Sequence, residues 1–522
     1  MTISSLRRPP LHYPDRPFHH FLSDAADRHP ERFGLIFGSD RYTYRDLDGL
    51  ANAVARSLAG LGFRPGQRAA LVVTNRPEWI IAQHGISLAG GSAVMPNPSW
   101  TAGELSSAFG ITRPAAVVAD GHLVPVVEAA EGAPALRICL DDPAPDGWLA
   151  FADLVYRSSG RRPEPLDGDL AALEAALPFS SGTTGLPKAV RHTHATLVAG
   201  TVNWKAASTI GENDRLQFFL PLFHIYGICC VAAAIAAGAP VTLFPRFDLD
   251  VMLRHIEEER ITIGFGAAPI AAAMANHPDL ERYDLSSLRY MLWAATPVNP
   301  AVAEAVSRRT GIRWLGAYGA TEAPCLHCNP VHAPDRWRLD SPGLPLSDVE
   351  VAVVDLETRA PVPPGGEGEV LVRAPHVMAG YLPKEADAEA FEDGWLRTGD
   401  VGWVEPDGWI HLTDRHKEMI KVNAFSVAPA EIEAVLFEHP AVADCAVYGV
   451  PDSLAGEVPK AAVVVRPGAQ VTEAELTAHV AAKLAGYKHV RHVAFVDAVP
   501  RTASGKVLRR VLRDADAVPA AS

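Results

Sequence analysis

The sequence has few cysteines, no excess of positive charge and no long apolar run. Its six cysteines in 522 residues, two of them adjacent at Cys229 and Cys230, are too few for a disulfide framework, so reduced thiols are expected. Basic residues number 47 against 61 acidic ones, and the net charge of −14 argues against a general binder of nucleic acid or anionic membranes. No unbroken stretch of about eighteen apolar residues occurs, so no membrane span is expected.

Two further absences narrow the class of protein. The first twenty residues hold two arginines with no apolar segment behind them, so no secretory signal is expected and the cytoplasm is the default location. Cys325-Leu326-His327-Cys328 is the one spacing that suggests a zinc or redox site, but no second pair of ligands stands at a useful distance along the chain. A soluble globular protein without a structural metal is the expectation.

Alternating apolar runs and helical periodicities predict an α/β fold. Residues 68–74, 78–88 and 92–95 are typical of strand, helix and strand, a β-α-β unit that implies a parallel sheet. The alternation resumes between 215 and 265, and short strands with turns predict a β-rich part beyond Pro361. The last hundred or so residues predict a compact α+β unit that ends in a Pro/Ser/Gly loop and a basic helix.

The run Leu177 to Val190, LPFSSGTTGLPKAV, is the stretch around which the chain is organised. An apolar segment ends at Phe179, two glycines then allow close backbone approach to an oxyanion, four hydroxyls add donors, and Lys188 adds a positive charge. The run is not a Walker A loop, because Ala189 follows the lysine where Ser or Thr is required. By composition alone it would be an ordinary surface loop; as a whole string it predicts a phosphate site.

This string resembles the phosphate loop of the adenylate-forming superfamily, which includes acyl-CoA synthetases, 4-coumarate-CoA ligase-like enzymes, luciferases and peptide-synthetase adenylation domains. Five further strings resemble the same superfamily in the same order, so the likeness extends from about residue 20 to 513. They are PLFHIYG (221–227), AYGATEAP (317–324), WLRTGDVG (395–402), DRHKEMIKVNAFSVAPAEIE (414–433) and PRTASGK (500–506). Taken singly, these strings also fit a core histidine, a turn or a solvated charge cluster.

The resemblance implies ATP and Mg²⁺ as cofactors and assigns roles to particular residues. Tyr318 would stack on adenine, Thr321 would reach the α-phosphate, Glu322 would hold Mg²⁺ and Asp400 would accept hydrogen bonds from the ribose. The nucleotide site as a whole would comprise Ser180, Ser181, Gly182, Thr183, Thr184, Gly185, Lys188, Tyr318, Gly319, Thr321, Asp400, Arg415 and Lys421. The catalytic groups would be Lys506, His224, Thr184 and Glu322.

The resemblance also implies a division into domains and a substrate pocket. A large multi-sheet N-terminal domain, residues 1–414, would combine parallel α/β subdomains with a β-rich subdomain, and a small mobile α+β domain, residues 415–522, would rotate about Lys417 and carry Lys506. Positional match places the acyl pocket at Trp204, Tyr226, Cys230, Ala295, Ala317, Ala320 and Cys325, which suits a flat aromatic or medium-chain acid.

The function implied is ATP-dependent activation of an acid through an adenylate, with release of pyrophosphate, followed by thioester formation with CoA. Three departures bear on it: Ala189 replaces a glycine expected on the helix side of the loop, Ala424 replaces a glycine near the pantetheine tunnel, and Ser426 replaces a glutamine. The change at Ala189 is mild, whereas those at Ala424 and Ser426 affect thiol delivery more than adenylation. The alternatives are a diazotase that activates nitrite for attack by an aryl amine, and loading of a carrier-protein thiol.

Overall fold

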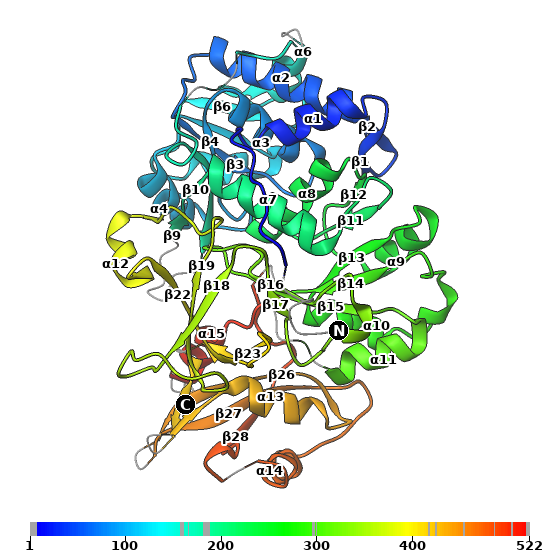
Figure 1. The fold of residues 1–522 in the computed structure, drawn as a ribbon, viewed down its shortest axis with the longest axis vertical. Coiled ribbons are helices and arrows are strands. Elements are labelled where there is room, and N and C mark those ends of the chain that lie inside the picture. Colours follow the sequence, from blue (N-terminus) through cyan, green and yellow to red (C-terminus); the bar gives the residue numbers. More distant parts are fainter. Residues whose placement is uncertain are drawn as a thin grey trace.

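The computed structural model describes residues 8–156, 161–164, 166, 168–180, 188–294, 298, 300–415, 418–422, 425–452, 455–484, 486–502 and 505–517. These residues form two nine-stranded sheets and two five-stranded sheets (Figure 1). The small sheet nearest the C-terminus lies at one end of the molecule, below the two large ones in the view of Figure 1. The predicted mixed α/β class, with a large multi-sheet N-terminal part and a small C-terminal unit, is confirmed.

The first nine-stranded sheet carries two of the predicted motifs at one edge. Six of its strands run parallel, in the order β15-β14-β13-β11-β12-β1, and antiparallel strands extend it at both ends. Because the carboxyl ends of parallel strands share one edge, the segments that follow β11 and β15 are brought together there. The strands are β1 (Phe33–Phe37), β2 (Asp40–Thr43), β11 (Leu216–Phe218), β12 (Val241–Leu243), β13 (Ile263–Gly266), β14 (Tyr290–Trp293), β15 (Trp314–Tyr318), β16 (His327–Cys328) and β17 (Leu344–Pro345).

The second nine-stranded sheet contains the predicted β-α-β unit. β3 pairs in parallel with β4 across α3 (Pro77–Leu88), as the sequence predicts. Ala69 and Leu71 on β3 face one hydrophobic cluster, whereas Ala70 and Val72 face another, because successive strand residues point to opposite faces. The strands are β3 (Arg68–Val72), β4 (Ser92–Met95), β5 (Ala116–Ala119), β6 (Leu136–Cys139), β7 (Leu149–Ala150), β8 (Glu174–Ser180), β9 (Lys188–Val190), β10 (His192–Thr193) and β20 (Tyr381–Leu382).

One continuous core joins the two large sheets. It includes residues of β3 and β4, of β11 to β15, and of the helices α1 (His20–Arg28), α2 (Tyr44–Gly60), α3, α6 (Phe151–Tyr156), α7 (His194–Ser208) and α8 (Ile225–Ala237). The helices α4 (Ala102–Thr112) and α5 (Val124–Glu128) cover the other face of the second sheet. The remaining long helices of the N-terminal part are α9 (Leu249–Glu258), α10 (Ala268–Asn276) and α11 (Pro300–Thr310).

The two smaller sheets follow one another along the chain. The third holds β18 (Glu350–Val354), β19 (Gly368–Arg373), β21 (Phe391–Glu392), β22 (Trp395–Val404) and β23 (Ile410–Arg415), next to α12 (Asp387–Ala390). The fourth holds β24 (Ile420–Val422), β25 (Phe425–Val427), β26 (Val442–Asp452), β27 (Gly456–Val465) and β28 (His492–Phe495), with α13 (Pro429–Phe437), α14 (Glu473–Ala481) and α15 (Arg509–Ala517). The change of sheet between Arg415 and Ile420 supports the proposed domain boundary at 414, which stays a prediction.

One local prediction is wrong. Ala189 does not lie on the helix side of the phosphate loop, because Phe179 pairs with Ala189 and Ser180 with Lys188 in an antiparallel β8–β9 hairpin. The loop therefore joins two strands, and the helix that follows, α7, begins only after a further short strand, β10. A β-branched valine after the alanine and pairing of β9 with β20 on its other side favour the extended conformation.

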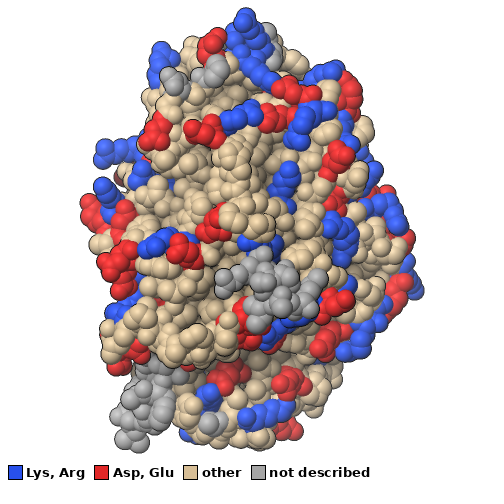
Figure 2. Space-filling model, viewed as in Figure 1, with Lys and Arg blue, Asp and Glu red and all other residues tan. Residues whose placement is uncertain are grey.

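Acidic and basic side chains are interspersed over the face shown in Figure 2. Among the described residues, no helix is long and apolar enough to cross a lipid bilayer.

Candidate active site

The phosphate hairpin meets a tyrosine from a distant part of the chain. Ser180 and Lys188 face each other at the base of the loop, and the predicted donors Ser181, Gly182, Thr183, Thr184 and Gly185 lie outside the described residues. The Nζ atom of Lys188 lies 5.2 Å from the centroid of the Tyr381 ring. Tyr381 is on β20, which pairs with β9 in antiparallel fashion. The hairpin base thus holds its cation against an aromatic face.

Thr321 and Glu322 follow β15 and are hydrogen-bonded to residues on or next to β20 and β10, the strands that flank the hairpin. The Tyr381 hydroxyl donates to Glu322 Oε1 at 2.7 Å, and the Met378 backbone N–H donates to the Glu322 carbonyl at 2.8 Å. His192 Nε2 donates to the Thr321 carbonyl at 2.8 Å. Burial lowers the pKa of His192 to about 4, so the ring is neutral at pH 7 and donates through Nε2.

Tyr318 and Asp400, both assigned to the nucleotide, are in direct contact. The Tyr318 hydroxyl donates to Asp400 Oδ2 at 2.5 Å, and Asp400 is only 7% exposed. Asp400 on β22 lies opposite Arg415 on β23 in the strand register, which places the two expected ribose contacts side by side in the backbone. The structure does not describe the side chains of Arg415 and Lys421, nor Lys417.

Gly319 must be a glycine for the turn after Tyr318 to form. A Cβ atom at this position would lie 2.5 Å from the backbone nitrogen of Cys325, closer than two such atoms can approach. The turn therefore folds the chain back tightly between the nucleotide residues and the loop that carries Cys325. This steric requirement is independent of any ligand.

His224 stands at the point where three segments converge. It is the N-cap of α8, and its Nδ1 accepts a hydrogen bond from the Tyr226 backbone N–H at 3.3 Å, which orients the ring. Burial lowers the pKa of His224 to about 4, while the charge of Glu322 acts to raise it and that of Lys506 to lower it. Glu322 and Lys506 are therefore both within electrostatic reach of this imidazole.

Lys506 reaches the site from the C-terminal unit on a turn with its own hydrogen bonds. The Thr502 N–H donates to the Lys506 carbonyl at 2.7 Å, and the Lys506 N–H donates to Thr502 Oγ1 at 3.1 Å. Gly505, at φ +86°, lies against the start of α10, where a Cβ atom on this residue would make an ordinary van der Waals contact of 3.4 Å with Pro269 Cδ. The turn is thus docked on the N-terminal part, next to the carboxyl edge of β13.

The expected acyl-pocket residues largely come together. The pKa of Tyr226 is raised by burial and, more weakly, by the neighbouring Cys230 and Cys325 thiols, and the Trp204 indole N–H faces Cys230. The Tyr226 hydroxyl is buried without a hydrogen-bond partner among the described residues. Ala317 and Ala320 follow at the end of β15, whereas Ala295 lies outside the described residues. These side chains form a mostly apolar cluster in which the Tyr226 hydroxyl and the Trp204 indole N–H have no hydrogen-bond partner among the described residues.

The residues that could bind a metal are few in this region. Cys325, His327 and Cys328 do not form a metal centre, since the described part of the chain contains no group of three or more His, Cys, Asp or Glu side chains that could hold an ion. All six cysteines are outside disulfides. A single carboxylate, Glu322, is consistent with Mg²⁺ bound mainly through substrate phosphates and water, as Mg²⁺ commonly is.

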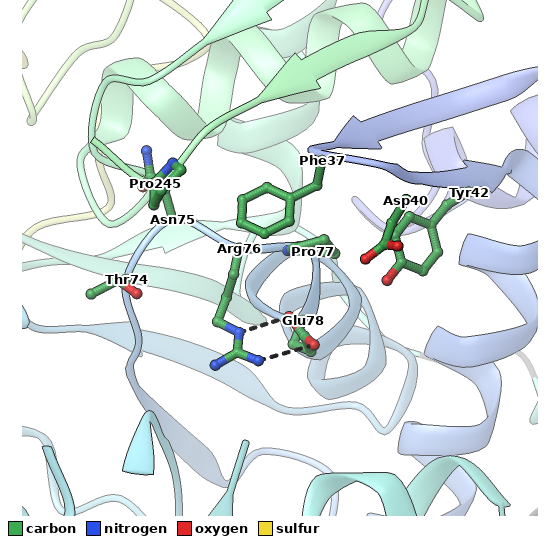
Figure 3. Close-up of a pocket in the computed structure, with 9 residues that line it drawn as sticks. All are labelled: Phe37, Asp40, Tyr42, Thr74, Asn75, Arg76, Pro77, Glu78 and Pro245. Atoms are coloured by element: carbon green, nitrogen blue, oxygen red, sulfur yellow. Dashed lines mark hydrogen bonds and ion pairs between the residues drawn. The ribbon is translucent and has the colours of Figure 1, made fainter. Parts of the chain in front are cut away.

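A surface pocket of about 340 Å³ lies beside the approach to His224 and contains none of the predicted site residues (Figure 3). Its Arg76 is paired with Glu78, Asp120 and Asp141, so its charge is neutralised. The Asn75 side chain, by contrast, is bonded to the segment that follows β11. The Asn75 amide donates to the carbonyls of Phe219 and Leu220 at 3.1 and 2.9 Å and accepts from the Leu222 N–H at 2.9 Å.

Sequence reasoning missed three residues that shape the site: Tyr381, His192 and Asn75. Each acts on a motif that lies far from it in the chain: 59 residues separate Tyr381 from Glu322, 129 separate His192 from Thr321, and 144 separate Asn75 from Phe219. Each contact joins a segment of the second sheet to a segment that follows a strand of the first sheet, and no local pattern marks it. Of these three residues, only His192 lies next to a motif strand in the sequence, two residues after the end of β9.

Comparison with known proteins agrees with this geometry. Residues 22–382 match the family described as AMP-binding enzyme, and residues 431–506 match the AMP-binding enzyme C-terminal domain. 4-Coumarate–CoA ligase 2 of Petroselinum crispum is 35% identical over 519 residues, covering 95% of this chain and 93% of that protein. The 4-coumarate–CoA ligase-like 9 protein of Oryza sativa subsp. japonica is 36% identical over 531 residues, covering 97% of this chain and 94% of that protein.

Solved structures show the same likeness. The anthranilate CoA ligase AuaEII, in complex with anthranoyl-AMP, matches with a TM-score of 0.89 and 28% identity over 99% of both chains. The amide bond synthetase McbA from Marinactinospora thermotolerans matches with a TM-score of 0.84 and 30% identity over 95% of this chain and 99% of its own. With its family match, its relatives and its fold in agreement, the chain belongs to the AMP-binding enzyme family, the adenylate-forming superfamily of AMP-forming ligases.

Proposed function

We propose that this protein activates an organic acid with ATP, releases pyrophosphate, and transfers the acyl group from the adenylate to the thiol of CoA. The observation that carries the proposal is the contact of Lys188 and Glu322 with one side chain, Tyr381, although the three residues belong to separate parts of the chain. The Tyr381 ring lies 5.2 Å from Lys188 Nζ, and its hydroxyl donates to Glu322 Oε1 at 2.7 Å. The named activities of the relatives support thioester formation.

In the first step, a carboxylate oxygen of the acid attacks the α-phosphorus of ATP, and the bond to the pyrophosphate leaving group breaks. Lys506 offsets the negative charge shared by the incoming carboxylate and the α-phosphate, and Lys188 with the backbone of the hairpin binds the outgoing phosphates. Tyr318 holds adenine and Asp400 holds the ribose. The neutral His224 forms the wall between nucleotide and acid, without adding a second positive charge.

The donor set fits a Mg²⁺ ion, which would neutralise phosphate charge while bound. Glu322 would contribute one carboxylate oxygen to the ion. The hydrogen bond from the Tyr381 hydroxyl fixes the plane of this carboxylate. The remaining ligands would be phosphate oxygens and water. The roles of Thr184 and the other loop donors follow from the same proposal.

In the second step, the CoA thiol attacks the carbonyl carbon of the adenylate and AMP leaves. Lys506 is not needed for this step, so we propose that the C-terminal unit then rotates about Lys417 and presents another face to the site. The cytoplasm is the proposed location, in keeping with the scarcity of cysteine. Oligomeric state and a carrier-protein acceptor are separate questions.

The acid is expected to be a small aromatic one with a polar substituent. The residues assigned to the acyl pocket include the flat side chains of Tyr226 and Trp204 and small thiols, and the ring of Tyr226 packs edge-on to Phe265 at 6.0 Å. The unpaired Tyr226 hydroxyl would gain a hydrogen bond from such a substituent, and an unmet buried hydroxyl costs about 1–3 kcal/mol.

A second candidate keeps the adenylation and changes the acceptor to an amine. The likeness to an amide bond synthetase favours it. A nitrite-activating diazotase would use the same first step. All these acceptors require the adenylate, so the first half-reaction is common to every candidate.

The test is a pyrophosphate-release screen across aromatic acids, fatty acids and nitrite, each with CoA, with an aryl amine or with neither. The proposal expects release with an aromatic acid that rises on addition of CoA, with the acyl-CoA detected by mass spectrometry. Amide formation in place of the thioester would establish the second candidate, and release that depends on nitrite and an aryl amine would establish the diazotase. No release with any acid would refute adenylation.

A further inference from the structure

Tyr381 contacts both a cation and an anion of the phosphate site. Its ring face lies 5.2 Å from Lys188 Nζ, and its hydroxyl lies 2.7 Å from Glu322 Oε1. Within the described residues, no direct ion pair joins Lys188 to Glu322. One side chain thus stands between the two opposite charges that must both meet a phosphate group.

The backbone under Tyr381 is held from two sides. Tyr381 pairs with Val190 on β9, and the Arg191 N–H donates to the Gly380 carbonyl at 2.8 Å. On the other side, the Tyr381 N–H donates to Asp387 Oδ1 at 2.6 Å. Gly380 has φ +122° and packs so tightly that a Cβ atom would lie 2.5 Å from Asp387 Oδ2. The ring is therefore fixed relative to the hairpin.

The chemistry of a phenol suits this position. The face of the ring is electron-rich and attracts an ammonium group, while the hydroxyl donates to a carboxylate, so a single residue orients both charges. If Lys188 and Glu322 met directly, they would neutralise each other and compete with the phosphate and the metal for the same partners. A phenylalanine at this position would keep the ring face that attracts Lys188 but lose the hydrogen bond to Glu322. A leucine would lose both.

We propose that Tyr381 is a positioning residue that holds Lys188 and Glu322 apart and aims both at the phosphates of the nucleotide. The inference depends on the proposed function, because it assigns an arrangement to the same phosphate site. Tyr381 does not touch the reacting atoms in this arrangement. It acts through Lys188 and Glu322.

The experiment measures binding of a non-hydrolysable ATP analogue, α,β-methylene-ATP, by calorimetry, with Mg²⁺ and separately with EDTA. Tyr381→Phe should lose about tenfold in affinity with Mg²⁺ and less than twofold in EDTA, because only the carboxylate is released. Tyr381→Leu should lose affinity under both conditions, because Lys188 also loses its support. In a Glu322→Gln background, Tyr381→Phe should have no further effect on the Mg²⁺ dependence.

Tyr283→Phe is the matched control. The Tyr283 hydroxyl also donates to a carboxylate, Asp250 Oδ1 at 2.8 Å, but on the surface near α9. This variant should bind the analogue as the wild type does. Equal losses for Tyr381→Phe in Mg²⁺ and EDTA, or no loss at all, would overturn the inference. Failure of the wild-type protein to bind the analogue would instead refute the proposed function, so the two failures are distinguishable.

Discussion

The contact between Tyr318 and Asp400 gives a prediction with a definite size. Replacing Tyr318 by phenylalanine keeps the ring that would stack on adenine and removes only the hydroxyl that donates to Asp400 at 2.5 Å. A hydrogen bond to a charged group contributes about 1.5–3 kcal/mol, and about 1.4 kcal/mol corresponds to a tenfold change in a binding constant. Asp400 is buried, so solvent does not replace the lost donor fully.

We therefore expect Tyr318→Phe to weaken ATP binding about tenfold, at the lower end of that range, because Asp400 would keep its place on the strand and its contact with the ribose. The assay is calorimetric titration with ATP and with 2′-deoxy-ATP. The wild type should prefer ATP, and the variant should show a smaller preference, since the carboxylate that reads the ribose is less well oriented.

The control is Tyr290→Phe on the neighbouring strand β14. The Tyr290 hydroxyl donates to the Ser208 carbonyl at 2.6 Å inside the core, so its removal should lower stability without altering ATP affinity. Equal losses of affinity in both variants would show that the effect is a general loosening of the sheet. Unchanged binding in Tyr318→Phe would refute the idea that this tyrosine orients Asp400.

Three further predictions follow from single residues. Lys506→Ala should reduce acid-dependent pyrophosphate release by orders of magnitude while turnover of a preformed adenylate with CoA stays nearly intact; equal damage to both half-reactions would contradict its assigned role. The wild-type protein should lose stability between pH 7 and pH 5, because the pKa of buried His192 is about 4 against about 6.5 in the unfolded chain, so only the unfolded state takes up a proton in that range. His192→Gln should make this loss of stability smaller by about 2 kcal/mol. Urea unfolding at the two pH values measures the loss, and an equal loss in both proteins would mean that His192 titrates normally. Asn75→Ala should destabilise the protein by roughly 3 kcal/mol, because two buried carbonyls and one N–H lose their partner. It should also lower pyrophosphate release, since the Phe219–Leu222 segment leads to His224. A loss of stability no larger than about 0.5 kcal/mol, the size of a surface effect, would show that water replaces the amide.

The helices and strands that the sequence located best are those with a strong local signal. The strand expected at 92–95 coincides with β4, and the helix expected at 78–88 coincides with α3 to within one residue. A short apolar run marks the strand, and Pro77 stands at the first position of the helix. The helix α7 escaped prediction because its buried side includes polar residues such as Asn203 and Thr201 alongside Trp204, so no clear apolar stripe forms. The strand after the phosphate loop was not predicted, because Lys188–Val190 is too short to give a clear pattern of its own.

By itself the sequence determined the chemistry that the chain carries: a loop rich in small donors, a lysine near its end, and an ordered series of motifs for adenine, ribose and metal. The family followed from these alone. The tertiary structure decided how the charges are oriented. Tyr381, His192 and Asn75 act through side-chain contacts between the two large sheets, across 59 to 144 residues of sequence, and burial is what keeps His192 and His224 neutral. Solvent exclusion and long-range pairing depend on the whole fold, which is why no local pattern of residues could announce them.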